Sequence, residues 1–390
     1  MTFRVSRHHI AGKRSASVYA LAICLTLLLY VTFLSAQDVP EKDAPARAAQ
    51  PSDIQAKIDV NDVSRSYVVH LPKGYDQQQH YPTVILLHGR NQDASDMARL
   101  THFNQLADKD SIIAVYPNSA HGQWNIGVRS DEAAAASPRR GYGRRGGWPG
   151  GGGGGYPGGG GGYPGSGGGY PGGGQGGGQN PEENRKRPEP VDDIAFLNQM
   201  LDQIALNYSL DTRRIYATGL SDGGFMALRV GCSMADRVAA IAAVGAAMPK
   251  TMICLPSRAI PALFINGTDD PVVPDNGGTY KPRRFHILSA EDSAKTWAKF
   301  DRCGEKPVQD KLPSAEKGGK DTKTYTYSGC QSNAQVVLYS VKNGGNTWPG
   351  GEQYTTEREV GKTSNALNAN EAIWNFLVTR KIAGESGVEK

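Results

Sequence analysis

Ser221 stands in the single G-x-S-x-G pattern of the chain, within the segment TGLSDGG. The strand-like residues RRIYA precede it and the helix-like residues FMALRV follow it. Gly219 and Gly223 would allow the tight strand-to-helix turn that exposes a serine hydroxyl, so the pattern predicts a nucleophile at Ser221. A purely structural turn is the alternative, because a chain with 49 glycines matches glycine patterns easily by chance.

A carboxylate that could serve this serine follows another strand-like segment, in FINGTDDPVVP. An acid at the carboxyl end of a strand can orient a histidine and stabilise its charged form. From its spacing to the VVP that follows, we expect this acid to be Asp270 rather than Asp269. A turn cap is the alternative for either residue, because aspartate is a common turn former.

Backbone N–H groups that could hold a negatively charged oxygen are expected at two places. One is the N–H of Asp222, and the other is the N–H of Arg90 or Asn91 in the loop after VILLHG. Paired donors of this kind stabilise an oxyanion by roughly 3 kcal/mol each in other acyl-transfer sites. We expect His88 to pack beneath this loop rather than act as a base.

The elements that must position these residues alternate along the chain. Short apolar segments rich in β-branched residues have the length of strands: SYVVHLP, TVILLHG, SIIAVYP, RRIYATGL, VAAIAAVG, PALFING and AQVVLYSV. Helical patterns include DDIAFLNQMLDQIALNY, with Asp192 or Asp193 as its cap, SAEDSAKTWAKF, which begins with a capping pattern at Ser289, and NANEAIWNFLVTRKI. The alternation predicts an α/β fold, with a mostly parallel sheet covered by helices on both faces.

The ends of this domain are marked by changes in composition. Residues 1–36 have the basic start, apolar run and small-residue exit of a secretory signal peptide. An uncleaved membrane anchor is the alternative, because the run approaches the length that spans a bilayer. Either reading sends the rest of the chain outside the cytoplasm, to an extracellular or periplasmic location. Residues 37–56 resemble a linker, and we expect the folded domain over residues 57–383.

A glycine-rich insertion interrupts the domain over residues 137–188, where Tyr-Pro pairs recur between runs of glycine. The segment has few apolar side chains to offset the entropy of ordering glycine, so we expect it to be disordered. The formal charge of the chain is +5, of which residues 1–36 contribute four positive charges, leaving +1 for the remainder. This balance gives no indication of a nucleic-acid partner.

Four cysteines remain once the one in the apolar N-terminal run is set aside. An even number in an exported protein favours disulfides, and four cysteines allow three connectivities. We favour pairing between neighbours, Cys232 with Cys254 and Cys303 with Cys330. Free buried thiols are the alternative. The cysteines have neither CxxC spacing nor histidine partners, so we expect no metal site, and no cofactor is implied.

Several motifs in their order along the chain resemble the secreted esterase family of polyhydroxybutyrate depolymerase-like enzymes and feruloyl esterases. They are LLHGRNQ, Trp124-Asn125, DDIAFL, GLSDGG, the serial cysteines, GTDDPVVP and NGGNTWPGG. The resemblance extends from about Tyr67 to Leu377 and implies an α/β-hydrolase fold that cleaves carboxylic esters in polymers or small substrates. It also implies Ser221 as the nucleophile and Asp270 as the acid of a catalytic triad.

The resemblance fails at the residue that should move protons. The family has histidine before Thr-Trp-Pro-Gly, whereas this chain has Asn346. An asparagine amide can hydrogen-bond to a serine hydroxyl but cannot accept its proton near neutral pH. His286, the only histidine after Asp270, and His121 in NSAHGQW are the possible alternative bases. Without such a base we expect weakened ester hydrolysis.

The alternative function is a catalytically degraded hydrolase fold that binds a polymer or carbohydrate at the cell surface. Trp124 and Trp348 could then offer ring faces for stacking on sugars or aromatic groups. Both tryptophans could equally pack in the core, which is the commoner fate of a large aromatic residue. The sequence carries no indication of oligomeric state, and a membrane contact is expected only if residues 1–36 remain uncleaved.

Overall fold

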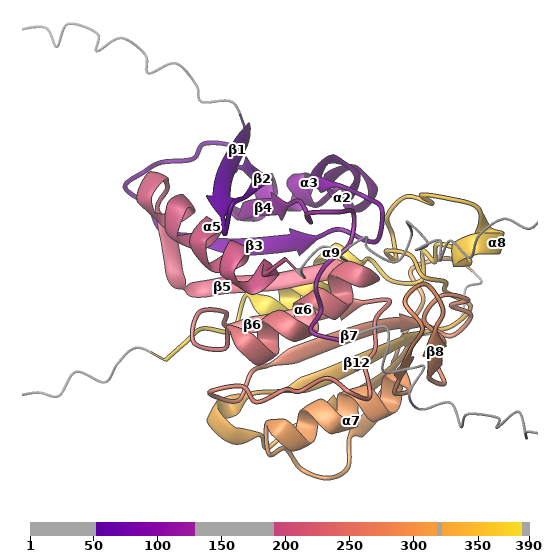
Figure 1. Ribbon diagram of the computed structural model, residues 1–390. Helices are drawn as coiled ribbons and strands as arrows, with labels where there is room; N and C mark the ends of the chain where they lie inside the picture. The colour runs from indigo at the N-terminus through magenta and orange to yellow at the C-terminus, as the bar shows by residue number, and fades with distance from the viewer. Residues whose placement is uncertain (1–51, 129–190, 318–321, 384–390) are drawn as a thin grey trace, which may run out of the picture. The chain divides into compact units, whose positions relative to one another are not determined.

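The computed structural model describes residues 52–128, 191–317 and 322–383 (Figure 1). The predicted signal peptide and the predicted glycine-rich insertion lie outside the described residues. Residues 53–56 of the predicted linker belong instead to strand β1 (Asp53–Val60), so the ordered domain starts earlier than expected. Within the described ranges, no helix is long and apolar enough to cross a membrane.

A ten-stranded sheet forms the centre of the described domain, in the order β1-β2-β4-β3-β5-β6-β7-β12-β11-β10. The strands from β4 to β12 in this order are parallel, and antiparallel pairs flank them on both sides. The mostly parallel sheet predicted from the sequence is confirmed. The parallel strands are β4 (Ile113–Pro117), β3 (Tyr81–Leu87), β5 (Leu210–Leu220), β6 (Ala240–Val244), β7 (Ala262–Gly267) and β12 (Val336–Val341).

Helices cover both faces of the sheet, as expected from the alternating pattern (Figure 1). Apolar residues of α5 (Asp193–Asn207), α6 (Asp222–Ser233) and α7 (Ala290–Phe300) pack in one core cluster. Those of α2 (Ala94–Thr101), α3 (Phe103–Asp110) and α9 (Ala369–Leu377) pack in a second one. Strand β3 supplies alternate side chains to the two clusters, because successive residues of a strand point to opposite faces.

The helix caps follow the local sequence. Asp192 accepts hydrogen bonds from the N–H groups of Ile194 and Ala195, both at 3.0 Å, and begins α5. The Ser289 hydroxyl accepts from the N–H of Asp292 at 3.0 Å and begins α7. Side chains of this kind satisfy N–H groups that have no partner within the helix. The predicted starts of these two helices are therefore confirmed, with Asp192 as the cap of the first.

Apart from β2, the remaining elements were not predicted, because they are short or polar. On one side of the parallel strands lie β1 and β2 (Val63–His70), of which β2 was predicted. On the other side lie β11 (Thr322–Tyr327) and β10 (Val308–Leu312). A separate hairpin pairs β8 (Gly278–Tyr280) with β9 (Phe285–Ile287). A short helix, α8 (Glu357–Val360), and a 3₁₀ turn, η2 (Gln331–Asn333), complete the described elements.

Both predicted disulfides are present. Cys232, near the end of α6, is bonded to Cys254 in the loop after β6. Cys303, just after α7, is bonded to Cys330, just after β11. Each bond closes a loop between neighbouring segments and so limits the conformations of the unfolded chain.

Candidate active site

The three residues predicted to form a triad lie at the carboxyl ends of parallel strands. Ser221 follows β5 directly, Asp270 lies just beyond β7, and Asn346 lies in the loop after β12. Because β5, β6, β7 and β12 are neighbours in the sheet, their carboxyl ends meet at one edge. Ligand sites of open α/β sheets form at this edge.

Ser221 occupies a strained turn between β5 and α6. Its φ of 55° and ψ of −116° lie outside the helical and extended regions, which is uncommon for a residue with a side chain. A Cβ on Gly223 would lie 1.9 Å from the carbonyl oxygen of Leu87, and one on Gly219 would lie 2.4 Å from that of Gly223. Both glycines are therefore required, and the turn has the cramped strand-to-helix geometry expected of a nucleophile elbow.

Asp270 and Asn346 are hydrogen-bonded to each other. Asn346 Nδ2 donates to Asp270 Oδ2 at 2.8 Å and also lies 3.1 Å from the carbonyl oxygen of Gly245. The other carboxyl oxygen of Asp270 accepts from the N–H groups of Val272 and Val273, at 2.8 and 2.7 Å. The acid therefore holds the amide through the bond that would orient an imidazole in a triad.

The glycines before Asn346 let its loop pack tightly against neighbouring backbone. A Cβ on Gly345 would lie 2.2 Å from the carbonyl oxygen of Val360. The Tyr354 hydroxyl donates to the backbone carbonyl of Asn346 at 3.0 Å and fixes the loop from the other side. Asn346 is fully buried as a result.

Burial dominates the electrostatics of the acid. It raises the pKa of Asp270 to about 7, while hydrogen bonds from Asn346, Val273 and Val272 act in the opposite direction. A neutral amide offers the carboxylate no compensating positive charge, whereas a histidine would become positively charged during the reaction. Asn346 Oδ1 is buried and has no hydrogen-bond partner among the described residues.

The backbone N–H groups predicted to hold the oxyanion belong to Asp222 and to Arg90 or Asn91, and they differ in whether they are already hydrogen-bonded. Asp222 is the first residue of α6, where an N–H has no acceptor within the helix. The N–H of Asn91 donates to the carbonyl oxygen of Gly122 at 2.6 Å, so it is already engaged. This contact rules against Asn91 as the second donor and favours Arg90.

His88 is buried beneath the loop that carries Arg90 and Asn91, as predicted. Its Nε2 accepts from the N–H of Ser119 at 3.0 Å, and its Nδ1 lies 2.7 Å from the carbonyl oxygen of Gly89. These partners require a neutral ring with the proton on Nδ1. Burial lowers the pKa of His88, which is consistent with that state.

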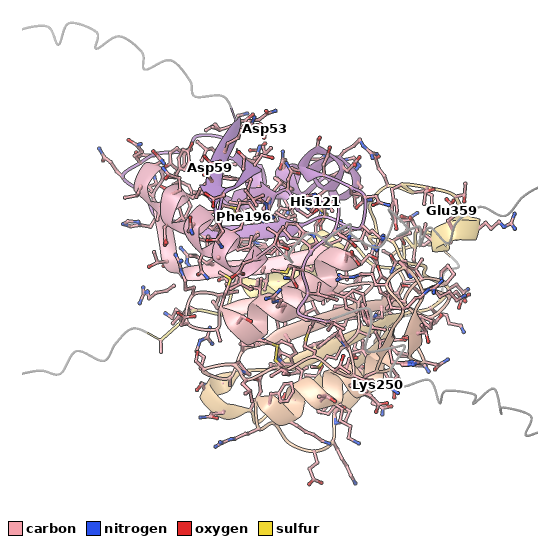
Figure 2. All side chains as sticks on the ribbon, in the orientation of Figure 1. Asp53, Asp59, His121, Phe196, Lys250 and Glu359 are labelled. Carbon is pink, nitrogen blue, oxygen red and sulfur yellow. A yellow bond between two sulfur atoms is a disulfide. The ribbon has the colours of Figure 1, made fainter. Side chains whose placement is uncertain are left out.

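Neither alternative base contacts the serine. His286 lies on β9 opposite Thr279, with its side chain exposed, while its neighbours Phe285 and Ile287 are buried. His121 is exposed in the loop after β4 (Figure 2). No imidazole in the part of the chain that the structure describes hydrogen-bonds to Ser221. The exposed ring of His286, which its strand turns outward, argues against His286 as the base.

The two tryptophans proposed as a stacking platform are both buried. Trp124 is 0% exposed, packs against the His88 ring and donates to the His88 carbonyl oxygen at 2.9 Å. Trp348 is also 0% exposed and donates to Asn370 Oδ1 at 2.9 Å. Neither ring offers a face to a ligand, so the predicted substrate-binding role is corrected to a packing role.

Tyr280, on β8, is a site residue that was not predicted. Its hydroxyl donates to Asp222 Oδ1 at 2.6 Å, and its ring packs against Phe225. No motif surrounds Tyr280 in the sequence, because its position depends on how the hairpin of β8 and β9 folds over α6. The alternation of buried and exposed residues on β9 is the only local signal, and it is too short to be recognised.

The strand order, with Ser221 in the turn after β5 and Asp270 after β7, is that of the α/β-hydrolase fold. The family model described as "Esterase PHB depolymerase" matches residues 65–140. The chain is 31% identical over 214 residues to the "Putative esterase NocK" of Nocardia uniformis subsp. tsuyamanensis, covering 52% of this chain and 62% of that protein. It is 31% identical over 162 residues to "Feruloyl esterase B" of Piromyces equi, covering 40% of this chain and 29% of that protein.

The resemblance to this group of esterases is thus confirmed, and the chain spans less than two thirds of the length of these relatives. Among solved structures, an acetyl xylan esterase from Aspergillus awamori is 11% identical, with a TM-score of 0.45 and coverage of 75% of this chain and 94% of that one.

Within the described residues, no group of three or more His, Cys, Asp or Glu side chains could hold a metal ion.

Proposed function

We propose that the protein is a serine carboxylic-ester hydrolase whose turnover is limited by the lack of a histidine base. The observation that carries this proposal is the Asn346 to Asp270 hydrogen bond, because it puts a non-basic amide where the acid of a triad would hold an imidazole. The strained elbow at Ser221 supports the nucleophile, since such strain clusters at functional sites.

Each residue has a defined role in this mechanism. Ser221 Oγ attacks the ester carbonyl carbon, and the carbonyl oxygen takes up negative charge near the N–H groups of Asp222 and Arg90. Collapse of this intermediate releases the alcohol and leaves an acyl group on Ser221. Water then attacks the acyl group and releases the acid.

Proton transfer is the weak step. Loss of a triad member can cost roughly a millionfold in rate, while the oxyanion hole and substrate binding retain about 10³ to 10⁴ over water. Slow but serine-dependent hydrolysis is therefore the expected behaviour. Esters with good leaving groups should be cleaved best, because their departure needs no proton.

The comparisons and the disulfides support the proposed location and substrate class. Two disulfides favour an oxidising compartment, so we place the protein outside the cytoplasm, whether extracellular or periplasmic. The named esterase relatives favour ester-bearing polymers or small esters as substrates. The alternative of a purely binding protein loses its main support, because Trp124 and Trp348 are buried.

Replacing Ser221 with alanine should lower the rate of 4-nitrophenyl acetate hydrolysis by at least about tenfold, to the rate of the uncatalysed or non-specific reaction. The measurement is the initial rate at pH 8 for both proteins, with circular dichroism to confirm that both are folded. Equal rates for the wild type and Ser221→Ala would exclude a serine mechanism in the wild type.

Replacing His286 or His121 with alanine should leave the same rate within about twofold, because both rings are exposed and neither contacts Ser221. The two variants are assayed beside Ser221→Ala under identical conditions. A loss in His286→Ala as large as that in Ser221→Ala would show that the hairpin rearranges to bring this imidazole to the serine.

A further inference from the structure

Tyr280 lies on the inward face of the hairpin formed by β8 and β9. The register pairs Tyr280 with Phe285 and Thr279 with His286, and the first pair is buried whereas the second is exposed. The Tyr280 ring packs against those of Phe225 and Phe285, with ring centroids 4.9 and 5.1 Å away. This packing fixes the ring and directs its hydroxyl to the elbow.

The Tyr280 hydroxyl connects Ser221 to the Asp222 carboxylate. It donates to Asp222 Oδ1 at 2.6 Å, and the Ser221 side chain lies within hydrogen-bonding reach of Tyr280, where it acts to lower the pKa of the phenol. Because the phenolic proton is given to Asp222, the Ser221 hydroxyl must be the donor in the second bond. The bonds therefore run in one direction, from Ser221 through Tyr280 to Asp222.

The Asp222 carboxylate, at the end of this series of hydrogen bonds, is able to take up a proton. Asp222 is fully buried, and its Oδ2 has no hydrogen-bond partner among the described residues. Burial raises the pKa of Asp222, while the bond from Tyr280 and the positive charges of Arg283 and Arg90 act in the opposite direction. Burial and the neighbouring Asp222 also raise the pKa of Tyr280, so its hydroxyl keeps a proton at rest.

We infer that Tyr280 and Asp222 together accept the proton of Ser221, in the role that Asn346 cannot fill. This inference rests on the proposed function, because it supplies the base for that reaction. Tyr280 is the catalytic residue that contacts the nucleophile, and Asp222 acts through it.

The proton and electron movements balance in each half of the reaction. As Ser221 Oγ bonds to the carbonyl carbon, its proton passes to Tyr280 Oη while the phenolic proton passes to Asp222 Oδ1. When the intermediate collapses, the carbon–alkoxide bond breaks and the same path returns a proton to the leaving oxygen. Water attacks the acyl group in the second half by the same exchange, and Ser221 recovers its proton.

A comparison of two backgrounds tests this relay. In the wild-type background, Tyr280→Phe should lower the Ser221-dependent kcat/KM for 4-nitrophenyl acetate by at least about tenfold, since positioned proton transfer contributes about 10² to 10⁴. In the Asn346→His background the same substitution should cost less than about threefold, because an imidazole then takes the proton. Equal losses in both backgrounds, or no loss in either, would overturn the relay.

Two further variants separate proton uptake from packing. Asp222→Asn keeps an oxygen that can accept from Tyr280 but cannot take up a proton, so it should lose as much activity as Tyr280→Phe. Tyr116→Phe is the matched control, because it also removes a buried hydroxyl with a 2.6 Å hydrogen bond, to Asn104 Oδ1. Thermal unfolding of both tyrosine variants shows whether an activity loss reflects unfolding.

The pH profile gives a readout that packing alone would not change. Wild-type kcat/KM should fall as pH is lowered through the raised pKa of Asp222, and this limb should be absent in Asp222→Asn. A Ser221-dependent wild-type rate that neither Tyr280→Phe nor Asp222→Asn lowers would overturn the relay and leave the proposed function standing. A wild-type rate equal to that of Ser221→Ala would instead overturn the proposed function, and the relay with it.

Discussion

Replacing Asn346 with histidine is expected to raise kcat/KM for 4-nitrophenyl acetate by at least about 100-fold, the lower range for positioned proton transfer. The Asp270 carboxylate already accepts a hydrogen bond from the side chain at this position, with its Oδ2 2.8 Å from Asn346 Nδ2. An imidazole there can give its Nδ1 proton to the acid and present Nε2 to Ser221. Gly245, which contacts Asn346, has no side chain to obstruct the ring.

The control for this gain is Asn346→Gln, which enlarges the side chain without adding a base and should not exceed the wild type. The double variant Asn346→His with Ser221→Ala should return to the rate of Ser221→Ala. The rescued enzyme should also lose activity as pH falls below about 6.5, the usual pKa of histidine. A folded Asn346→His with wild-type activity would mean that this position does not face the nucleophile.

Replacing Asp270 with asparagine is expected to stabilise the protein as pH rises. The pKa of Asp270 is raised by burial to about 7, so the folded state retains a proton that the unfolded chain loses above its pKa of 3.8. The protonated carboxyl of Asp270 contributes its full stability to the wild-type protein below pH 3.8. This contribution is lost progressively as pH rises, until the carboxyl of the folded protein also ionises near pH 7. Asparagine does not titrate and avoids this loss.

The difference in the free energy of unfolding between Asp270→Asn and the wild type should therefore increase by roughly 2 to 3 kcal/mol as pH rises from 5 to 8. Urea unfolding at several pH values measures this difference directly. Burial also raises the pKa of Asp301 to about 7, but this residue is present in both proteins and cancels in the difference.

Asp269→Asn is the matched control for this measurement, because Asp269 is exposed beside the same turn and should change stability by less than about 0.5 kcal/mol. An amide at position 270 can also donate to the unpartnered Oδ1 of Asn346 if that side chain reverses. A difference between Asp270→Asn and the wild type that does not vary with pH would contradict the buried titrating carboxyl.

Local patterns were sufficient to predict the strands that carry the site. Each apolar segment predicted as a strand overlaps a strand of the sheet, and the turn around Ser221 follows from glycines whose added Cβ atoms would collide with backbone. Asp270 could be assigned because it lies close after a recognisable strand, and Asn346 because it stands at the histidine position of the motif that resembles the family. These features depend on near neighbours in the chain, which a sequence displays directly.

The parts that could not be predicted depend on contacts between distant segments. Trp124 and Trp348 are residues of a type common in binding surfaces. Both are buried, and their hydrogen-bond partners, His88 and Asn370, belong to separate segments of the chain. The N–H of Asn91 is engaged by the carbonyl oxygen of Gly122, which belongs to another loop. Tyr280 reaches Asp222 only because a short hairpin, with little hydrophobic pattern of its own, folds over α6.

The most direct test of the account is the mass of the intact wild-type protein after incubation with 4-nitrophenyl acetate. Without a histidine base, attack by water on the acyl group should be slower than acylation by an ester with a good leaving group, so one acetyl group should accumulate. Peptide mapping should locate it on Ser221, and Ser221→Ala should lack it. An unmodified wild type, or the same modification in Ser221→Ala, would contradict a nucleophilic Ser221.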